Sequence, residues 1–238
     1  MKKWLLAALL LLVIPSVQYA KATPSGTPLY TYKFKSQQEA EYHWSLGELV
    51  LLPESTFKEK DVLEMVENLN KVDENILRLA ADKGVKIKLF DGPITNESKL
   101  HDLKGKTPHG YEGTGLTWED IPGLCENKYV YAKIGHSSYG MGHGSVALEL
   151  HELGHAVDKY VFGQVRKQPA FLNIWKQESG IIFQNRAYFT SFPEEYFAEV
   201  FAMLYFSEDS RNVLRADAPL TYAFLLKLEN DAALFAKQ

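Results

Sequence analysis

Residues His151 to His155 read His-Glu-Leu-Gly-His inside an apolar stretch that favours a helix. Two histidines four residues apart on a helix differ by about 40° in direction and about 6 Å in height. Both imidazoles can therefore reach one metal ion, while Glu152, about 100° round from His151, can face a water molecule beside it. This pattern is typical of zinc hydrolases, although a surface helix can also carry the same five letters.

A second helix further along the chain carries the acids that such a site requires. Pro193 to Met203 begins with proline and has acidic residues in its first turn, both of which favour a helix start. Glu195 and Glu199 are four residues apart and share one face. They could simply favour the helix dipole. A catalytic zinc site takes three protein ligands, however, so together with the histidine motif one is expected to bind metal and the other to orient a histidine.

The combined pattern resembles that of a known family. His151 to Asp158, then Tyr188, then Glu194 to Glu199 are similar to the lethal-factor-like zinc peptidases of Gram-positive bacteria, and above all to their small secreted Pro-Pro endopeptidases. The resemblance extends from about Gly110 to Leu228, and before Gly110 it covers only the general organisation. In this family the third zinc ligand opens the sequence Glu-aromatic-Phe-Ala-Glu, which implies Glu195 here.

The resemblance implies one Zn²⁺ per chain, held by His151, His155 and Glu195. Glu152 is then expected to take a proton from water and return it to the leaving nitrogen as the catalytic base and acid. In the family a tyrosine seven residues before the third ligand stabilises the transition state, which implies Tyr188. Packing beside neighbouring phenylalanines is the alternative for that tyrosine. Glu199 is expected to hold the second ring nitrogen of a ligand histidine.

The substrate implied by the resemblance is a proline-rich peptide or protein, cut between two prolines. Trp118 corresponds to a family tryptophan that lines the cleft, and Glu194 is a candidate substrate contact beside the ligand. Leu116 departs from the pattern, because the family has lysine there, which leaves the preferred flanking residues open. Two alternatives remain: a metallopeptidase of different or broad specificity, and a secreted zinc-binding protein that does not catalyse.

The expected fold class is α+β, zincin-like, with a small twisted mixed sheet packed on the active-site helix and a helical C-terminal lobe. Ser145 is the expected N-cap of the active-site helix, which should run to about Phe162. Strands are predicted at Glu48 to Leu52, Val85 to Phe90 and Lys128 to Ile134, one long helical region at Lys58 to Lys83, and loops from Asp91 to Asn127. The strand at Lys128 to Ile134 is predicted to be the edge that pairs with substrate.

The glycine-rich loop, Gly135 to Gly144, precedes the active-site helix and is expected to lie over the cleft. Its two histidines, His136 and His143, could compete for metal, but a role as loop anchors is favoured. The single cysteine, Cys125, cannot form an internal disulfide and is interpreted as a structural thiol.

The N-terminus is typical of a secretory signal peptide. Met1 to Ala22 has two lysines at its start, an apolar run too short to span a bilayer, and an Ala-Lys-Ala cleavage site. The remaining residues, 23–238, are expected to form a single metallopeptidase domain, with an α/β lobe at about 28–162 and a helical lobe at about 163–238. A secreted chain with one cysteine indicates a Gram-positive bacterium.

The net charge of the chain limits the classes of partner that it can bind. The whole chain has 26 basic and 30 acidic residues and a net charge of −4, and loss of Lys2, Lys3 and Lys21 makes the mature chain more acidic. An acidic surface argues against nucleic acid as a partner. We therefore expect an extracellular monomer that has no membrane association after signal cleavage and that acts on a proline-rich substrate.

Overall fold

The computed structural model describes residues 24–35, 42–108 and 111–235, so the predicted signal peptide lies outside the described residues. Five short strands form one mixed sheet in the order β1-β2-β3-β5-β4. Strands β2, β3 and β5 run parallel to one another, whereas β1 and β4 pair antiparallel at the two edges. The strands are β1 Thr27–Pro28, β2 Val50–Leu52, β3 Lys86–Phe90, β4 Gly123–Glu126 and β5 Tyr129–Lys133.

The edge nearest the active-site helix is β4, and the prediction that Lys128 to Ile134 forms this edge was wrong. Strand β5 lies between β3 and β4, with Leu124 of β4 opposite Tyr131 of β5. The segment that contains β4 was predicted to be loop because of its many glycines and prolines. Asn127 explains the difference: it adopts a positive φ of 56° in the tight turn that joins β4 to β5.

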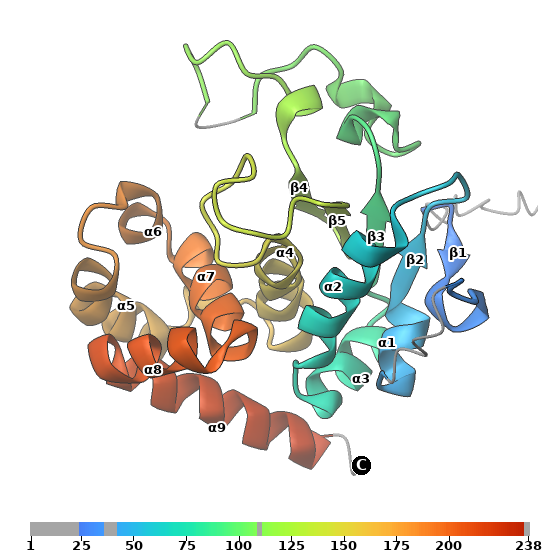
Figure 1. Ribbon diagram of the computed structural model, residues 1–238. Helices are drawn as coiled ribbons and strands as arrows, with labels where there is room; N and C mark the ends of the chain where they lie inside the picture. The colour runs from blue at the N-terminus through green and yellow to red at the C-terminus, as the bar shows by residue number, and fades with distance from the viewer. Residues whose placement is uncertain (1–23, 36–41, 109–110, 236–238) are drawn as a thin grey trace, which may run out of the picture.

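Helices account for most of the remaining chain. Figure 1 shows α5 to α9 together on one side of the molecule and α1 to α3 beside the sheet on the other, with α4 between the two groups. The described helices are α1 Trp44–Leu49, α2 Glu59–Asn70, α3 Glu74–Asp82, α4 Leu148–Ala156, α5 Pro169–Ile182, α6 Ala187–Ser191, α7 Pro193–Phe206, α8 Glu208–Asp217 and α9 Pro219–Phe235. The α+β prediction is confirmed.

The long helical region predicted before the second strand is divided into α2 and α3. Asp73 separates them, because its side chain accepts hydrogen bonds from the backbone N–H groups of Asn75 and Ile76 at 3.0 and 3.3 Å. Such a cap satisfies the first free amides of a new helix and starts it at a fixed residue. Buried apolar residues of both helices still share the core that lies against the sheet.

Close packing between α4 and α7 joins the two sides of the molecule. Gly154 of α4 faces Ala198 of α7, and a Cβ added to Gly154 would lie only 2.9 Å from the Ala198 Cα. The missing side chain therefore allows the two helix backbones to approach each other. Because His151 and His155 lie on α4 and Glu195 lies on α7, this contact also sets the distance between the predicted ligands.

Candidate active site

The active-site helix begins two residues later than predicted. Ala147, not Ser145, is the residue that precedes α4, and Ser145 instead accepts the Ala147 N–H on its hydroxyl at 3.3 Å. Beyond Ala156 the helix widens into a π-helical turn, Val157–Val161, and ends at Phe162 as predicted. The apolar residues on both sides of the motif bury all of α4 except His155, which is partly exposed to the cleft.

The three predicted metal ligands lie together. One carboxylate oxygen of Glu195, Oε2, is 3.2 Å from Nε2 of His151 and 3.4 Å from Nε2 of His155. Donor atoms about 2.0–2.1 Å from a tetrahedral zinc ion lie about 3.3 Å from one another. The spacing and the chemistry of this His/His/Glu group therefore fit a catalytic zinc ion.

Glu199 holds the far side of His151. Its Oε2 accepts from Nδ1 of His151 at 3.1 Å, and its Oε1 accepts from the backbone N–H of Val146 at 3.1 Å. The carboxylate is fully buried, so both contacts are shielded from water. This pairing fixes the imidazole so that Nε2 points at Glu195 and His155.

The contacts among these histidines and glutamates also shift the pKa values of His151 and Glu195. Burial lowers the pKa of His151, but hydrogen bonds to Glu195 and Glu199 outweigh it and raise that pKa to about 10. Burial raises the pKa of Glu195, but His151 and His155 outweigh it and hold that pKa well below its usual range. The carboxylate of Glu195 is therefore the anionic partner of the two histidines.

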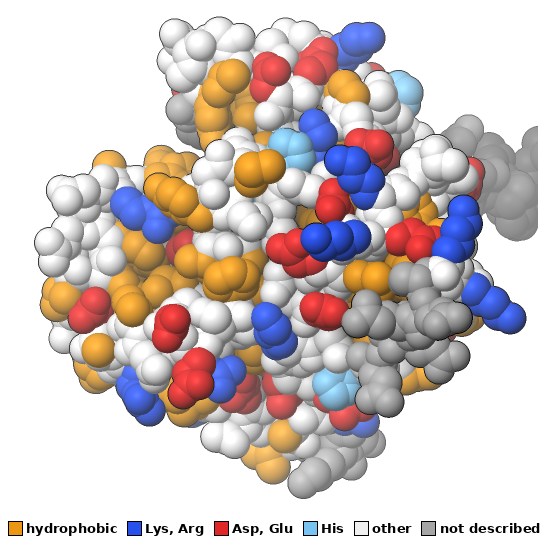
Figure 2. Space-filling model, viewed as in Figure 1, with side chains coloured by type: hydrophobic (Ala, Val, Ile, Leu, Met, Phe, Trp, Pro, Cys, Tyr) orange, Lys and Arg blue, Asp and Glu red, His pale blue; other side chains and the backbone are white. Residues whose placement is uncertain are grey.

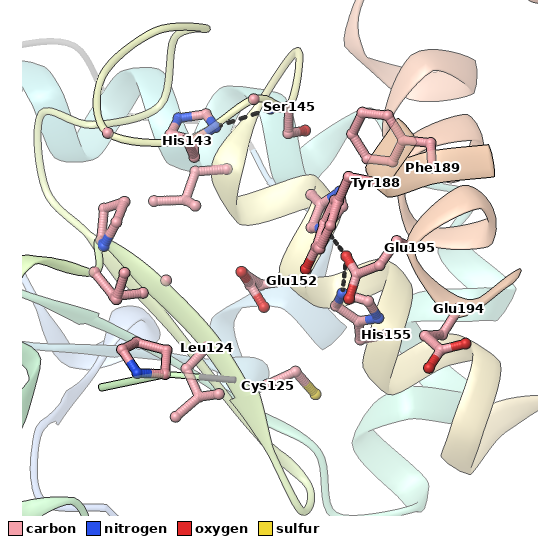
Figure 3. A pocket seen from close by; sticks show the side chains of 18 of the residues that line it. Leu124, Cys125, His143, Ser145, Glu152, His155, Tyr188, Phe189, Glu194 and Glu195 are labelled. Carbon is pink, nitrogen blue, oxygen red and sulfur yellow. Dashed lines mark hydrogen bonds and ion pairs between the residues drawn. The ribbon is translucent and has the colours of Figure 1, made fainter. Parts of the chain in front are cut away.

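Glu152 faces the space beside these ligands. Figure 3 shows its carboxylate directed into the pocket between His155 and the strand that carries Leu124 and Cys125. The backbone N–H of Cys125 donates to it, while burial raises the pKa of its carboxyl group. A carboxylate whose pKa is raised by burial is suited to take up a proton near neutral pH.

Tyr188 approaches the same space from α6. Its side chain extends toward Glu152 and His155 in Figure 3. Burial of the phenol and the nearby carboxylate of Glu195 raise its pKa far above the usual value, so the hydroxyl keeps its proton. The ring also contacts Phe189 and Phe192 edge to face, at centroid distances of 5.6 and 5.8 Å. The packing role and the hydrogen-bonding role are therefore compatible.

A cleft of 680 Å³ surrounds these residues, and both predicted substrate contacts, Trp118 and Glu194, line it. Trp118 also packs on a small apolar cluster beneath it, formed by Phe90, Ile94, Leu100 and Tyr131. In the view of Figure 2, apolar side chains gather over the side that holds α5 to α7, whereas charged side chains predominate over the side that holds α1 to α3 and the sheet. Leu116 does not line the cleft and is 39% exposed.

The further residues that line the cleft, outside the predicted site, include Tyr111, Lys159 and Arg186. Burial of Tyr111 raises the pKa of its hydroxyl, and the nearby negative charges of Glu195 and Glu152 raise it further. No spacing rule points to Tyr111, since it stands in a loop. Arg186 precedes α6 as its N-cap residue, and its spacing from Tyr188 gives no direction for its side chain either.

The histidines of the glycine-rich loop act as anchors. His143 donates from Nε2 to the His136 carbonyl at 2.7 Å and accepts the Ser145 N–H on Nδ1 at 3.1 Å. His136 bonds through Nδ1 to the Met141 carbonyl at 2.7 Å. Cys125 is partly exposed on the cleft wall, and desolvation raises the pKa of its thiol, which agrees with its interpretation as a structural thiol.

A twisted mixed sheet with an antiparallel edge strand beside a His-Glu-x-x-His helix, and a carboxylate supplied by a following helix, define a zincin-like fold. The chain belongs to the anthrax lethal factor family. The family model described as "Anthrax toxin lethal factor, N- and C-terminal domain" matches residues 35–228. The resemblance stated from the sequence is thereby confirmed.

Relatives with assigned names are similar over most of the chain. A Pro-Pro endopeptidase of Paenibacillus alvei is 41% identical over 195 residues, which are 82% of this chain and 89% of that protein. A Pro-Pro endopeptidase of Clostridioides difficile is 36% identical over 227 residues, 95% of this chain and 97% of that one. The solved structure of the Pro-Pro endopeptidase PPEP-2 from Paenibacillus alvei matches with a TM-score of 0.75 and 42% identity, covering 77% of this chain and 99% of that chain.

Proposed function

We propose that this protein is a secreted zinc endopeptidase that hydrolyses the bond between two prolines in proline-rich segments of extracellular or surface proteins. The observation that carries the proposal is the junction of His151, His155 and Glu195 around one point, with Glu152 beside it. Relatives called Pro-Pro endopeptidase, at 41% and 36% identity, support the same activity.

The reaction follows from the positions of the side chains. Zinc, when bound by His151, His155 and Glu195, supplies a Lewis acid and lowers the pKa of water toward about 7. Glu152 removes a proton from the attacking water and later returns it to the nitrogen of the leaving proline. Tyr188 donates a hydrogen bond to the oxyanion that develops on the scissile carbonyl, a contribution of about 3 kcal/mol.

Substrate is bound beside β4. An extended peptide can add to the free edge of β4 by backbone hydrogen bonds. Two consecutive prolines lack N–H donors, so they must be held through their carbonyl groups and by contacts to their rings. Trp118 and Tyr188 supply aromatic surfaces on the cleft, and such surfaces suit the stiff, polyproline-like conformation of these segments. Glu194 is proposed to contact the substrate next to Glu195.

The location and organisation of the chain complete the proposal. Residues 1–22 act as a signal peptide, and residues 23–238 form one metallopeptidase domain, with lobes at about 28–162 and 163–238, that works as an extracellular monomer. The residue pattern at the N-terminus supports secretion. Within the described part of the chain, no helix has the length and apolarity to span a membrane.

Removal and return of the metal test the proposal. The purified protein, without residues 1–22, is incubated with a fluorogenic peptide that contains Pro-Pro, before and after treatment with a zinc chelator. We expect cleavage to stop with the chelator and to return when one equivalent of Zn²⁺ is added. Binding of one zinc without cleavage of any Pro-Pro peptide would instead favour a binding protein.

A further inference from the structure

Arg186 connects three parts of the active-site wall. It precedes the five-residue helix α6 as its N-cap residue and stands two positions before Tyr188. Its Nη1 lies 3.9 Å from Oε1 of the fully buried Glu199 on α7. The guanidinium also lies over the ring of Phe189, 4.3 Å from its centroid, and 5.5 Å from that of Phe183.

The contact between Arg186 and Glu199 resembles the contact between Tyr188 and Glu195. Tyr188 interacts with Glu195, and Arg186 interacts with Glu199. The two members of each pair lie on α6 or its N-cap and on α7, where Glu195 and Glu199 are one helical turn apart. Any movement of Arg186 relative to Glu199 would therefore also move Tyr188 relative to Glu195.

Apart from the interaction of its hydroxyl with Glu195, Tyr188 is held mainly through its own short helix. The residue is 49% exposed, and its ring contacts the rings of Phe189 and Phe192, both on or beside α6. The far side of α6 is attached to α5 where Trp175 donates to the Phe189 carbonyl at 3.2 Å. On the cleft side, Arg186 is the charged link between α6 and the buried floor.

The glycine-rich loop leaves room for the guanidinium. A Cβ added to Gly144 would lie 3.2 Å from Nη2 of Arg186, closer than side chains normally pack. On the same loop, the Tyr139 ring centroid lies 5.7 Å from the guanidinium carbon. A planar cation can stack on a ring and pair with a carboxylate at the same time, which the compact ammonium group of lysine cannot do.

We infer that Arg186 is a positioning residue that anchors α6 to Glu199 and thereby sets the place of Tyr188 in the cleft. The inference rests on the proposed function for its catalytic consequence, but the anchoring itself does not depend on it. Displacement of a catalytic group by about 1 Å can lower turnover by about 100-fold. Loss of the anchor should therefore lower kcat much more than it changes KM.

The first experiment compares kcat and KM for zinc-saturated Arg186→Met, Arg186→Lys, Tyr188→Phe and the double variant Arg186→Met with Tyr188→Phe. Arg215→Met is the matched control, because Arg215 is exposed on α8 and bonds only to Asn212 within its own helix. We expect Arg186→Met to lower kcat by about 10- to 100-fold with KM within about threefold. Arg186→Lys should be intermediate, and the double variant should match Tyr188→Phe within about twofold.

An equal loss of kcat in the Tyr188→Phe background would overturn the inference, because Arg186 would then act independently of Tyr188. A change confined to KM would also overturn it and make Arg186 a substrate contact.

Hydrogen exchange gives a second readout that needs no activity. We expect amides of residues 187–192 to exchange at least about tenfold faster in Arg186→Met, with α7 unchanged. Unchanged exchange of residues 187–192 would contradict the anchoring role. If the wild-type protein cleaves no Pro-Pro peptide, the proposed function fails, and this exchange measurement still decides the role of Arg186.

Discussion

The floor of the cleft and its walls differ in how their side chains are held. On the floor, Glu199 is fully buried, and His151 and Glu152 are 7% and 9% exposed. On the walls, Tyr188 is 49% exposed, Trp118 and Glu194 are partly exposed, and the backbone runs through short helices and glycine-containing loops. The floor thus has fixed geometry for one reaction, whereas the walls, apart from Tyr188 and its proposed anchor Arg186, carry the proposed substrate contacts. The buried floor residues therefore serve the proposed reaction, whereas the more exposed wall contacts serve substrate specificity.

The largest effect is expected on the floor. Glu152→Gln keeps the size of the side chain but removes the base, so kcat/KM should fall by about 1,000-fold or more, about 4 kcal/mol. The three ligands are unchanged, so the variant should still bind one zinc per chain in a metal assay. Glu208→Gln, an exposed change on α8, serves as the control and should retain full activity. Substantial activity in Glu152→Gln would exclude Glu152 as the base.

Helix packing beneath the floor should produce the next largest effect. Gly154→Ala places a Cβ 2.9 Å from the Ala198 backbone, so α4 and α7 must separate. We expect a loss of about 1–3 kcal/mol in the free energy of unfolding and weaker zinc binding, because the ligands lie on both helices. Gly180→Ala is the matched control. No atom lies within 4 Å of its added Cβ, so the better helix former should stabilise α5 by about 0.5–1 kcal/mol. Denaturant unfolding measures both.

At the proposed substrate contact Trp118, a substitution should alter substrate binding more than turnover. Trp118→Ala removes an aromatic surface from the cleft, and KM should rise by about tenfold, about 1.4 kcal/mol, with kcat within about threefold. Leu103→Ala is a suitable control, because Leu103 packs on the same small apolar cluster but does not line the cleft. A fall in kcat alone for Trp118→Ala would mean that this wall takes part in the chemistry.

The smallest effect concerns the glycine-rich loop at mildly acid pH. Burial lowers the pKa of His143, whose Nδ1 accepts the Ser145 N–H. A histidine with a lowered folded-state pKa binds fewer protons when folded, so the loop should lose stability as pH falls below about 6.5. Linkage limits this loss to about 1.4 kcal/mol at pH 5.5, one pH unit below the usual histidine pKa. It would be seen as faster amide exchange in residues 137–146, after correction for intrinsic rates, and should be absent in His143→Gln.

The floor could be predicted from the sequence because its geometry is local. Helical spacing alone brings His151 and His155 to one face, and the same rule pairs Glu195 with Glu199. The contact between α4 and α7, by contrast, joins residues that are far apart in the sequence. It depends on Gly154 facing Ala198, and no periodicity predicts that contact, so the partnership of His151 with Glu195 required the family pattern as well.

The walls could not be predicted in the same way. Strand β4 was predicted to be loop, because pairing with β5 stabilises it despite weak local preference for a strand. The start of α4 was misplaced because the Ser145 hydroxyl bonds to Ala147, which forms a turn before the helix. Tyr111 and Arg186 reach the cleft from irregular segments, where sequence spacing gives no direction for a side chain.

The most direct test is mass-spectrometric mapping of the cuts that residues 23–238 make in a peptide library containing Pro-Pro, with Glu152→Ala as the blank. The account predicts cuts between adjacent prolines by the wild-type protein alone, all of them abolished by a chelator. Cuts at other bonds, cuts that persist in Glu152→Ala, or no cuts by a protein that holds zinc would contradict it.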